Sequence, residues 1–202
     1  VAADSARKSW SDLGLEKRTI WLDKIADALE SKSEEIASLE SLDTGKPISL
    51  ARAVDASRSV ANFRFFAEFA RDYKSEKFEM DDAINHVILK PVGIAGLITP
   101  WNLPLYLLSW KIAPAIVMGN TVVAKPSELT PLTANLLAEV IHEVGLPAGV
   151  VNIVHGLGSE AGQSIVEHPK VNLISFTGGT MTGRKVAETA SPMFKKLSLE
   201  LG

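Results

Sequence analysis

Residues 92–104 read VGIAGLITPWNLP, a short apolar run with several β-branched side chains that ends in a turn bounded by two prolines. Runs of the same kind recur along the chain, with helical patterns between them: strands are predicted at 92–98, 121–124, 150–154 and 173–176, and helices at 105–118, 132–144, 160–167 and 181–189. Strands separated by helices of this length are typical of βαβ units, in which a parallel sheet is covered on both faces. The sequence therefore predicts an α/β fold with a doubly wound, Rossmann-like parallel sheet.

Long helices are expected before this sheet, because charged side chains concentrate in the first 90 residues and apolar ones recur there at helical spacing. Ser31 and Glu34 have the spacing of a capping box, which would place the start of a helix there. A second long helix is predicted from about Ser49 to Tyr73. Its predicted packed face consists of Val54, Val60, Phe63, Phe66 and Phe69.

The composition argues against several classes of function. The 202 residues carry a net charge of -3, so no overall basic field draws the protein to nucleic acid. The most apolar stretch, 92–118, contains prolines and Lys111, and is predicted to be strand and helix rather than a membrane span. The chain has no cysteine, hence no disulfide and no thiol nucleophile. No metal site is predicted, because metal-ligand spacing is absent among His86, His142, His155 and His168.

Four segments at predicted strand ends are candidates for chemistry, because ligands of doubly wound sheets bind beyond the carboxyl ends of the strands. In the first, Pro100 and Pro104 fix the backbone around Asn102. An Asn amide can donate a hydrogen bond to a developing oxyanion, and a preorganised donor of this type lowers the activation free energy by about 3 to 4 kcal/mol. The alternative is an Asn that only satisfies its turn.

The second segment, Lys125-Pro126-Ser127-Glu128, combines a cation with a carboxylate. Together they could hold two ribose hydroxyls. A carboxylate accepts from a 2′-hydroxyl and repels a 2′-phosphate, which favours NAD over NADP. In the alternative, Lys125 is simply exposed, and Ser127 or Glu128 helps to start the next helix.

The third and fourth segments are rich in glycine, at 156–162 and 178–183, and each lies between a predicted strand and a predicted helix. Both present helix N-termini where a pyrophosphate could bind. Neither has the G-x-G-x-x-G spacing of a dinucleotide-binding turn, so ordinary tight turns remain the alternative.

A lone carboxylate, Glu200, lies in an alternating strand pattern at 196–202. Glu is unusual in a core, and partial burial would raise its pKa toward the range useful for a general base. A solvent-facing position is the alternative.

Five segments in this order resemble the aldehyde dehydrogenase superfamily: ITPWNLP, KPSELTP, GLPAGVVNIVHG, ISFTGGT and LSLELG. The resemblance covers essentially the whole chain. Within the superfamily, NFRFFAE followed by PWNLPLYLLSWKIAPA is most similar to the 2-aminomuconate semialdehyde dehydrogenase group. The resemblance implies that residues 1–85 form a helical N-terminal part of the cofactor-binding domain. It implies that residues 86–202 form the NAD-binding sheet of that domain, truncated before the catalytic domain.

The resemblance also implies a mechanism, in which a Cys thiolate attacks the aldehyde, hydride passes to NAD and water hydrolyses the thioester. By the family pattern, Asn102 would stabilise the oxyanion and Glu200 would activate the water. Lys125 and Glu128 would hold the adenosine ribose. The predicted cofactor-binding residues are Thr99, Pro100, Trp101, Lys125, Ser127, Glu128, Gly158, Gly162, Phe176, Gly178, Gly179, Thr180 and Gly183.

The chain departs from the family pattern in ways that bear on function. The family nucleophile lies a few dozen residues beyond Glu200, so this chain is expected to be a fragment without it. Gly179 replaces the usual Ser, which removes one hydroxyl from the pyrophosphate turn. Two alternatives therefore stand beside NAD-dependent aldehyde oxidation. One is an inactive truncated isoform that binds nucleotide or a sister subunit, and the other is an acylating dehydrogenase that uses coenzyme A.

The expected substrate is a small aldehyde, and a muconate-type semialdehyde would bring a carboxylate. Arg58 is a candidate to bind that carboxylate, because small residues surround it and a guanidinium matches a carboxylate in two hydrogen bonds. The alternative is a solvated arginine on a charged helix. No nucleic-acid or membrane partner is expected, the full-length protein is expected to form a homo-oligomer, and the expected location is cytoplasmic.

Overall fold

The computed structural model describes all 202 residues. Its main sheet has five strands: β3 (Ile94–Ile98), β4 (Thr121–Lys125), β5 (Val151–Ile153), β6 (Val171–Gly178) and β7 (Lys196–Leu201). All neighbours run parallel, in the order β5-β4-β3-β6-β7. The chain moves from β3 to β4 and β5 on one side, then returns to β6 and β7 on the other. The doubly wound prediction is confirmed, and the order reverses beside β3.

The register of the sheet brings the functional turns together. Ile98, the last residue of β3, pairs with Lys125 at the end of β4 and with Phe176 near the end of β6. On the far side of β6, Thr177 pairs with Glu200 of β7. The segments that follow β3, β4 and β6 therefore start at the same edge of the sheet, which is where a ligand of such a fold binds.

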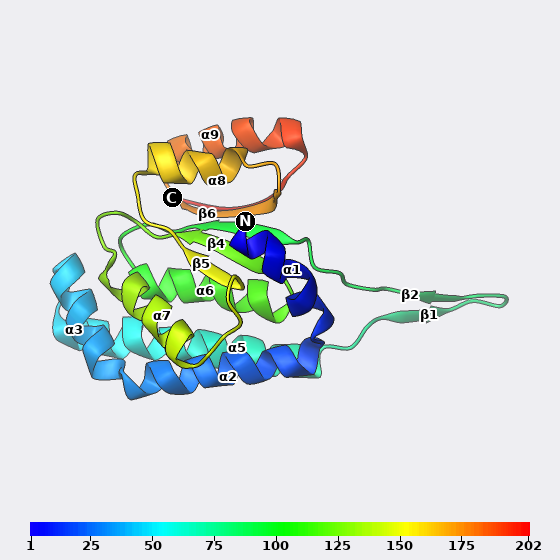
Figure 1. Cartoon of the computed structure of the whole chain (residues 1–202), viewed down its shortest axis with the longest axis horizontal. Coiled ribbons are helices and arrows are strands. Elements are labelled where there is room, and N and C mark those ends of the chain that lie inside the picture. The colour runs from blue at the N-terminus through cyan, green and yellow to red at the C-terminus, as the bar shows by residue number, and fades with distance from the viewer.

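Helices cover both faces of the sheet (Figure 1). The helices are α1 (Ala2–Asp12), α2 (Leu15–Ser31), α3 (Ser33–Thr44), α4 (Ile48–Leu50), η1 (Ala51–Ala56), α5 (Ser57–Asp72), α6 (Pro104–Val117), α7 (Leu132–Glu143), η2 (Gly158–Gly162), α8 (Gln163–Glu167), α9 (Thr180–Ala190) and η3 (Ser191–Met193). α8 and α9 lie on one face, and α6 and α7 on the other (Figure 1). α2 and α5 form a further layer outside α6 (Figure 1). None of the helices combines the length and apolar character that a membrane crossing requires.

Two apolar cores hold these layers together. The larger one lies between the sheet and the helices α2, α5, α6 and α7, and includes Leu29, Phe63, Leu108 and Leu137. The smaller one lies under α8 and α9, with Ile174 at its centre. Because the larger core joins residues from both predicted parts, 1–85 and 86–202, the two parts pack as one body; the domain division itself stays a prediction.

A two-stranded antiparallel ribbon, β1 (Lys77–Glu79) and β2 (Ile84–His86), was not predicted. All six of its residues are exposed, and it projects away from the body of the molecule (Figure 1). Residues 1–85 are therefore not purely helical. The strands are short and carry charges, so they lack the apolar runs that indicated the central strands.

The second long helix was predicted without a break, and this is wrong in detail. Between α4 and α5 the chain forms η1, a π-helical turn. Phe63 is fully buried, but Phe69 is 57% exposed, so the predicted packed face is wrong for Phe69. The capping box is also absent: the hydroxyl of Ser31 donates to the carbonyl of Ala28, and α3 begins without a side-chain cap.

Candidate active site

A cleft of about 530 Å³ opens at the carboxyl ends of β3, β4 and β6, beside the point where the strand order reverses. It is lined by every predicted cofactor-binding residue except Thr180 and Gly183. Thr182, from the predicted segment 178–183, also lines the cleft. The sequence had not indicated Gln163 or Lys185, which line it from α8 and α9. These residues became visible only once the helices were packed, because their polar side chains are ordinary for exposed helix positions.

Lys125 and Glu128 form a preorganised pair on one wall of the cleft. Lys125 is only 3% exposed, so the alternative of a simply exposed lysine is wrong. Its ammonium donates a hydrogen bond to the Glu128 carboxylate, whose side chain is 38% exposed. This hydrogen bond lowers the pKa of Glu128 below its ordinary value. The carboxylate is therefore charged, oriented and accessible to a ligand.

Two other polar groups on this wall differ in how they are used. The Ser127 hydroxyl accepts a hydrogen bond from the backbone N–H of Leu129 at 3.2 Å, so it stabilises the turn before α7. Thr99 is buried, and its hydroxyl has no hydrogen-bond partner within the chain. An unpaired buried hydroxyl is unfavourable, and a residue of this kind in the lining of a cleft is consistent with a ligand that lies there.

The two glycine-rich segments supply further parts of the cleft lining. Gly158 is the first residue of η2, Gly179 is the N-cap of α9, and the space where a Cβ would stand is open at both. The backbone can thus be approached closely at two helix N-termini. Outside the lining, the Thr180 hydroxyl donates to the carbonyl of Gly202 at 2.6 Å, and a Cβ on Gly183 would stand 2.4 Å from Leu201. The structure therefore places Thr180 and Gly183 in the packing of α9 against β7.

Asn102 and Glu200 line one cavity, of about 450 Å³, although they are far apart in the sequence. This cavity adjoins the cleft, with which it shares Pro100, Trp101, Thr177, Gly178 and Gly179. Both side chains are exposed, so the expected partial burial of Glu200 is wrong. The Asn102 side chain makes no hydrogen bond to the rest of the chain, unlike an amide that satisfies its own turn.

Lys111 is a further ionisable group near Glu200 that the sequence indicated only as an interruption of an apolar run. Both residues line a cavity of about 340 Å³, together with Trp110, Ser175 and Ser198. Lys111 is 6% exposed, and its ammonium donates to the Ser175 hydroxyl at 2.7 Å. Burial lowers its pKa from 10.5 to about 8, against the opposing effect of the Glu200 charge. A charge inside an apolar helix was the signal that could have identified this residue.

Arg58 lies on α5 in an exposed position, outside the lining of the cleft and of the two cavities beside it. The other three arginines of η1 and α5 form ion pairs: Arg52 with Glu34, Arg64 with Glu30, and Arg71 with Asp23. Arg58 has no such partner. Its guanidinium is therefore available to a ligand, and equally available to solvent.

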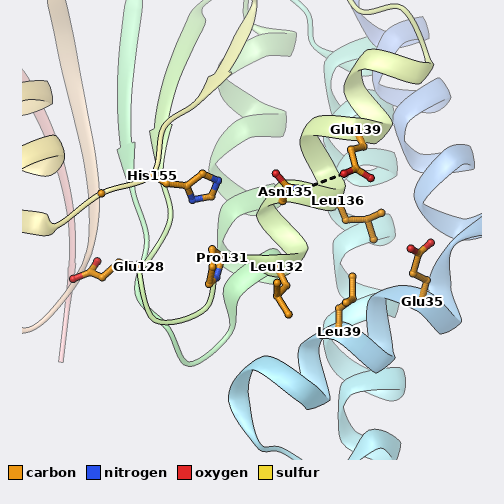
Figure 2. A pocket seen from close by; sticks show the side chains of 10 residues that line it. Glu35, Leu39, Glu128, Pro131, Leu132, Asn135, Leu136, Glu139 and His155 are labelled. Atoms are coloured by element: carbon orange, nitrogen blue, oxygen red, sulfur yellow. Dashed lines mark hydrogen bonds between the residues drawn. The ribbon is translucent and has the colours of Figure 1, made fainter.

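A separate cavity of about 540 Å³ lies between α3, α7 and the segment after β5 (Figure 2). Of the predicted site residues, it contains only Glu128, whose side chain points away from those of Leu39, Leu136 and Glu139 (Figure 2). Glu128 thus lines both this cavity and the cleft. Its carboxylate points away from the cavity between α3 and α7. The cavity in Figure 2 is not part of the candidate active site.

The fold and the cleft define a doubly wound α/β protein whose candidate site lies at the switch point of its sheet. Residues 1–202 match the model of the aldehyde dehydrogenase family, and the chain belongs to that family. The resemblance predicted from the sequence, to this superfamily and within it to the 2-aminomuconate semialdehyde dehydrogenase group, is confirmed.

Curated relatives include 2-aminomuconic semialdehyde dehydrogenase of Homo sapiens, which is 51% identical over 203 residues, with 100% of this chain and 42% of the relative covered. The 2-hydroxymuconic semialdehyde dehydrogenase of Pseudomonas sp. (strain CF600) is 46% identical, with 100% and 43% covered. The chain thus spans about two fifths of the length of the relatives it matches.

Solved structures agree with this assignment. PnpE in complex with nicotinamide adenine dinucleotide superposes with a TM-score of 0.95 at 46% identity, covering 100% of this chain and 42% of that one. The NAD+ complex of an aldehyde dehydrogenase from Bacillus cereus gives a TM-score of 0.96 at 40% identity, again covering 100% and 42%. The prediction of an aldehyde dehydrogenase-like α/β fold is confirmed.

Proposed function

We propose that this chain is the cofactor-binding part of an enzyme that oxidises an aldehyde to a carboxylic acid with NAD. The observation that carries the proposal is the meeting of Asn102 and Glu200 in one cavity, directly beside the cleft at the switch point. A donor for an oxyanion and a base for water are the two groups that acyl chemistry on an aldehyde carbon needs beside a nucleophile.

NAD fits the cleft in several respects. Relatives of this fold are solved as NAD complexes. Here the Lys125–Glu128 pair would hold the hydroxyls of the adenosine ribose, and the open backbone at Gly158 and Gly179 leaves room for the pyrophosphate near helix N-termini. When bound, NAD supplies the acceptor for a hydride. The charged Glu128 favours a 2′-hydroxyl over a 2′-phosphate at the ribose.

The chemistry of this chain's own residues follows from their placement. The Asn102 amide, free of internal hydrogen bonds, would donate to the oxygen of the aldehyde as negative charge develops on it. Glu200 would accept a proton from the water that releases the acid. The thiol that the family uses as a nucleophile is absent from these 202 residues. We therefore infer that the working enzyme is longer and contributes a cysteine from outside this chain.

For the substrate, we propose a semialdehyde that carries a carboxylate, of the muconate type. Curated relatives at 51% and 46% identity are named for such compounds. The unpaired Arg58 supplies a guanidinium that could bind the carboxylate. This part of the proposal depends on a different residue from the oxidation itself, so each can fail alone.

The test uses the full-length protein that contains this chain. We expect it to form NADH from a semialdehyde, and we expect Asn102→Ala to lower kcat about 10²- to 10³-fold, as for the loss of one oxyanion donor. Glu200→Gln should leave a rapid first formation of NADH but block turnover, because the thioester persists. Asn85→Ala, on the exposed strand β2, is the matched control.

Two results would contradict the proposal: no NADH from any aldehyde by the wild-type full-length protein, or unchanged kcat in both the Asn102 and the Glu200 variants. Binding of NAD without turnover by the full-length protein would favour the inactive, nucleotide-binding alternative. A requirement for coenzyme A in place of water would favour the acylating one.

A further inference from the structure

Three charged side chains are buried together next to the turn that carries Asn102. Glu40 and Asp55 are 0% exposed and Lys46 is 11% exposed. The Lys46 ammonium donates to both carboxylate oxygens of Asp55 at 2.8 Å and lies 3.6 Å from Oε2 of Glu40. None of the three lines the cofactor cleft or the two cavities beside it.

This buried triad contacts the catalytic turn on both sides of Pro104. The Lys46 ammonium also donates to the backbone carbonyl of Asn102 at 3.2 Å. Oε1 of Glu40 accepts the backbone N–H of Leu105 at 3.0 Å, one of the N–H groups that the first turn of α6 leaves unpaired. A carboxylate at this position also interacts favourably with the positive end of the helix. Hydrogen bonds from the triad thus fix the turn at the carbonyl of Asn102 and at the start of α6.

The segments that supply the triad are themselves held in place. Glu40 comes from α3, and Lys46 follows Gly45, which ends α3 in a left-handed conformation at φ 74°. The Ser41 hydroxyl donates to the carbonyl of Lys46 at 2.7 Å. Asp55 comes from the π-helical turn η1, a type of turn that is frequent near functional sites and changes which residues face inward.

Stability alone is a poor explanation for the triad. Burying ion pairs removes charges from water, and an apolar replacement of similar shape is often as stable. Oε2 of Glu40 has no hydrogen bond. Burial raises the pKa of Glu40, against the hydrogen bonds from Leu105 and Thr133 that lower it. An apolar cluster could not form the two directional hydrogen bonds that the triad makes, one to the carbonyl of Asn102 and one from the N–H of Leu105.

We propose that Glu40, Lys46 and Asp55 are positioning residues that hold the turn of Asn102 in the geometry its amide needs as an oxyanion donor. The inference rests on the proposed function of Asn102. It assigns a role in catalysis to residues that touch neither substrate nor cofactor. Positional errors of about 1 Å in such a group can lower a rate about 10²-fold, which sets the expected scale.

A double-mutant cycle in the full-length enzyme tests the proposal. We expect Lys46→Met to lower kcat about 10- to 100-fold while the KM for NAD stays within about twofold. In an Asn102→Ala background the same change should lower kcat by less than about threefold, because the group being positioned is gone. The control is Arg52→Met, which removes an exposed ion pair on the same π-helical turn and should leave kcat unchanged.

A conservative pair of variants covers the case in which Lys46→Met does not fold. Glu40→Gln keeps an oxygen that can accept from Leu105, whereas Glu40→Leu does not, and both preserve the approximate volume. We expect Glu40→Gln to retain most of the kcat that Glu40→Leu loses. This rescue would not be seen if the position only needed to be filled.

Amide hydrogen exchange over residues 99–107 gives a readout that does not depend on activity. We expect faster exchange there in Lys46→Met or Glu40→Leu than in Arg52→Met. Equal kcat losses in the two backgrounds, unchanged kcat, or unchanged exchange would each overturn the positioning role. An Asn102→Ala variant with full activity would instead reject the proposed role of Asn102 as oxyanion donor, and the exchange measurement would still decide whether the triad holds the turn.

Discussion

At the scale of single residues, Glu128 gives the sharpest test of cofactor choice. Its carboxylate is charged, exposed to the cleft and oriented by Lys125. We expect Glu128→Gln to narrow the preference for NAD over NADP, because the repulsion of a 2′-phosphate is lost. Lys125→Ala should weaken the binding of both. Dissociation constants in the full-length protein measure this, with Glu139→Gln, in the cavity of Figure 2, as control; an unchanged ratio would reject the role of Glu128.

The buried Lys111 should leave a mark on stability as a function of pH. Its pKa is about 8 in the folded chain, against 10.5 ordinarily. The folded state therefore binds fewer protons than the unfolded state between these values, so the free energy of unfolding should rise with pH there. Between pH 7 and pH 9.5 wild type should gain about 2 kcal/mol relative to Lys111→Met.

Chemical denaturation at several pH values measures this gain. Lys8→Met, at an exposed position of α1, should show no such trend relative to wild type. If the free energies of unfolding of wild type and Lys111→Met changed with pH in parallel, the surroundings of Lys111 would not lower its pKa.

Arg58 offers the test of substrate class. We expect Arg58→Ala to lower kcat/KM about 10- to 100-fold for a carboxylate-bearing semialdehyde and to leave a neutral aldehyde of similar length unaffected. Arg64→Ala, which removes an ion-paired arginine of the same helix, should affect neither substrate. Equal losses on both substrates, or none on either, would favour the solvated arginine.

At the scale of elements, the central strands were predictable and the irregular segments were not. The strands β3 and β4 are buried along almost their whole length because helices cover both faces of the sheet, and this burial gives an apolar run that can be recognised in the sequence. The ribbon β1–β2 and the π-helical turn η1 leave none, since one is exposed throughout and the other differs from an α-helix by a single hydrogen-bond register.

The turn that leads into β5 is expected to depend on its glycines to different degrees. Gly145 and Gly149 both have positive φ, at 74° and 86°. A Cβ on Gly145 would meet nothing within 4 Å, whereas on Gly149 it would stand 2.6 Å from the carbonyl oxygen of Ala2. We expect Gly145→Ala to lower the free energy of unfolding by about 1 kcal/mol, through backbone strain alone. Gly149→Ala should lower it further, by about 2 to 3 kcal/mol in total.

Comparing the free energies of unfolding of the two variants under identical conditions separates backbone strain from the steric clash with Ala2. If Gly149→Ala is no worse than Gly145→Ala, then α1 does not pack against this turn in solution.

At the scale of the whole molecule, the cleft could be predicted better than its surroundings. Parallel strands end at a common edge, so residues from turns as distant as Thr99, Lys125 and Gly178 could be grouped from the pattern alone. Residues that act from outside the cleft could not be grouped. In the sequence, Lys46 and Glu40 are only two charges among the many of the first 90 residues, because tertiary packing alone brings them to Asn102.

The chain by itself is expected to form no NADH from NAD and a semialdehyde, because it has no thiol. Fluorescence of NADH measures this, with the full-length protein as the positive control. Turnover by the isolated 202 residues that is lost in Asn102→Ala would show that a different nucleophile operates.

Because the ribbon of β1 and β2 is exposed, the backbone can be cut there without loss of either core. Its six residues contribute nothing to either core, while side chains on both sides of it, Phe63 before and Leu108 after, meet in the larger one. A protease that cut the ribbon tip would leave two pieces that stay associated through this core and through hydrogen bonds between them, such as those of Trp10 and Arg18 to carbonyls of α6. The molecule is thus divisible at this point into two complementary fragments, and new chain ends or an inserted segment could be accommodated there without disturbing the sheet.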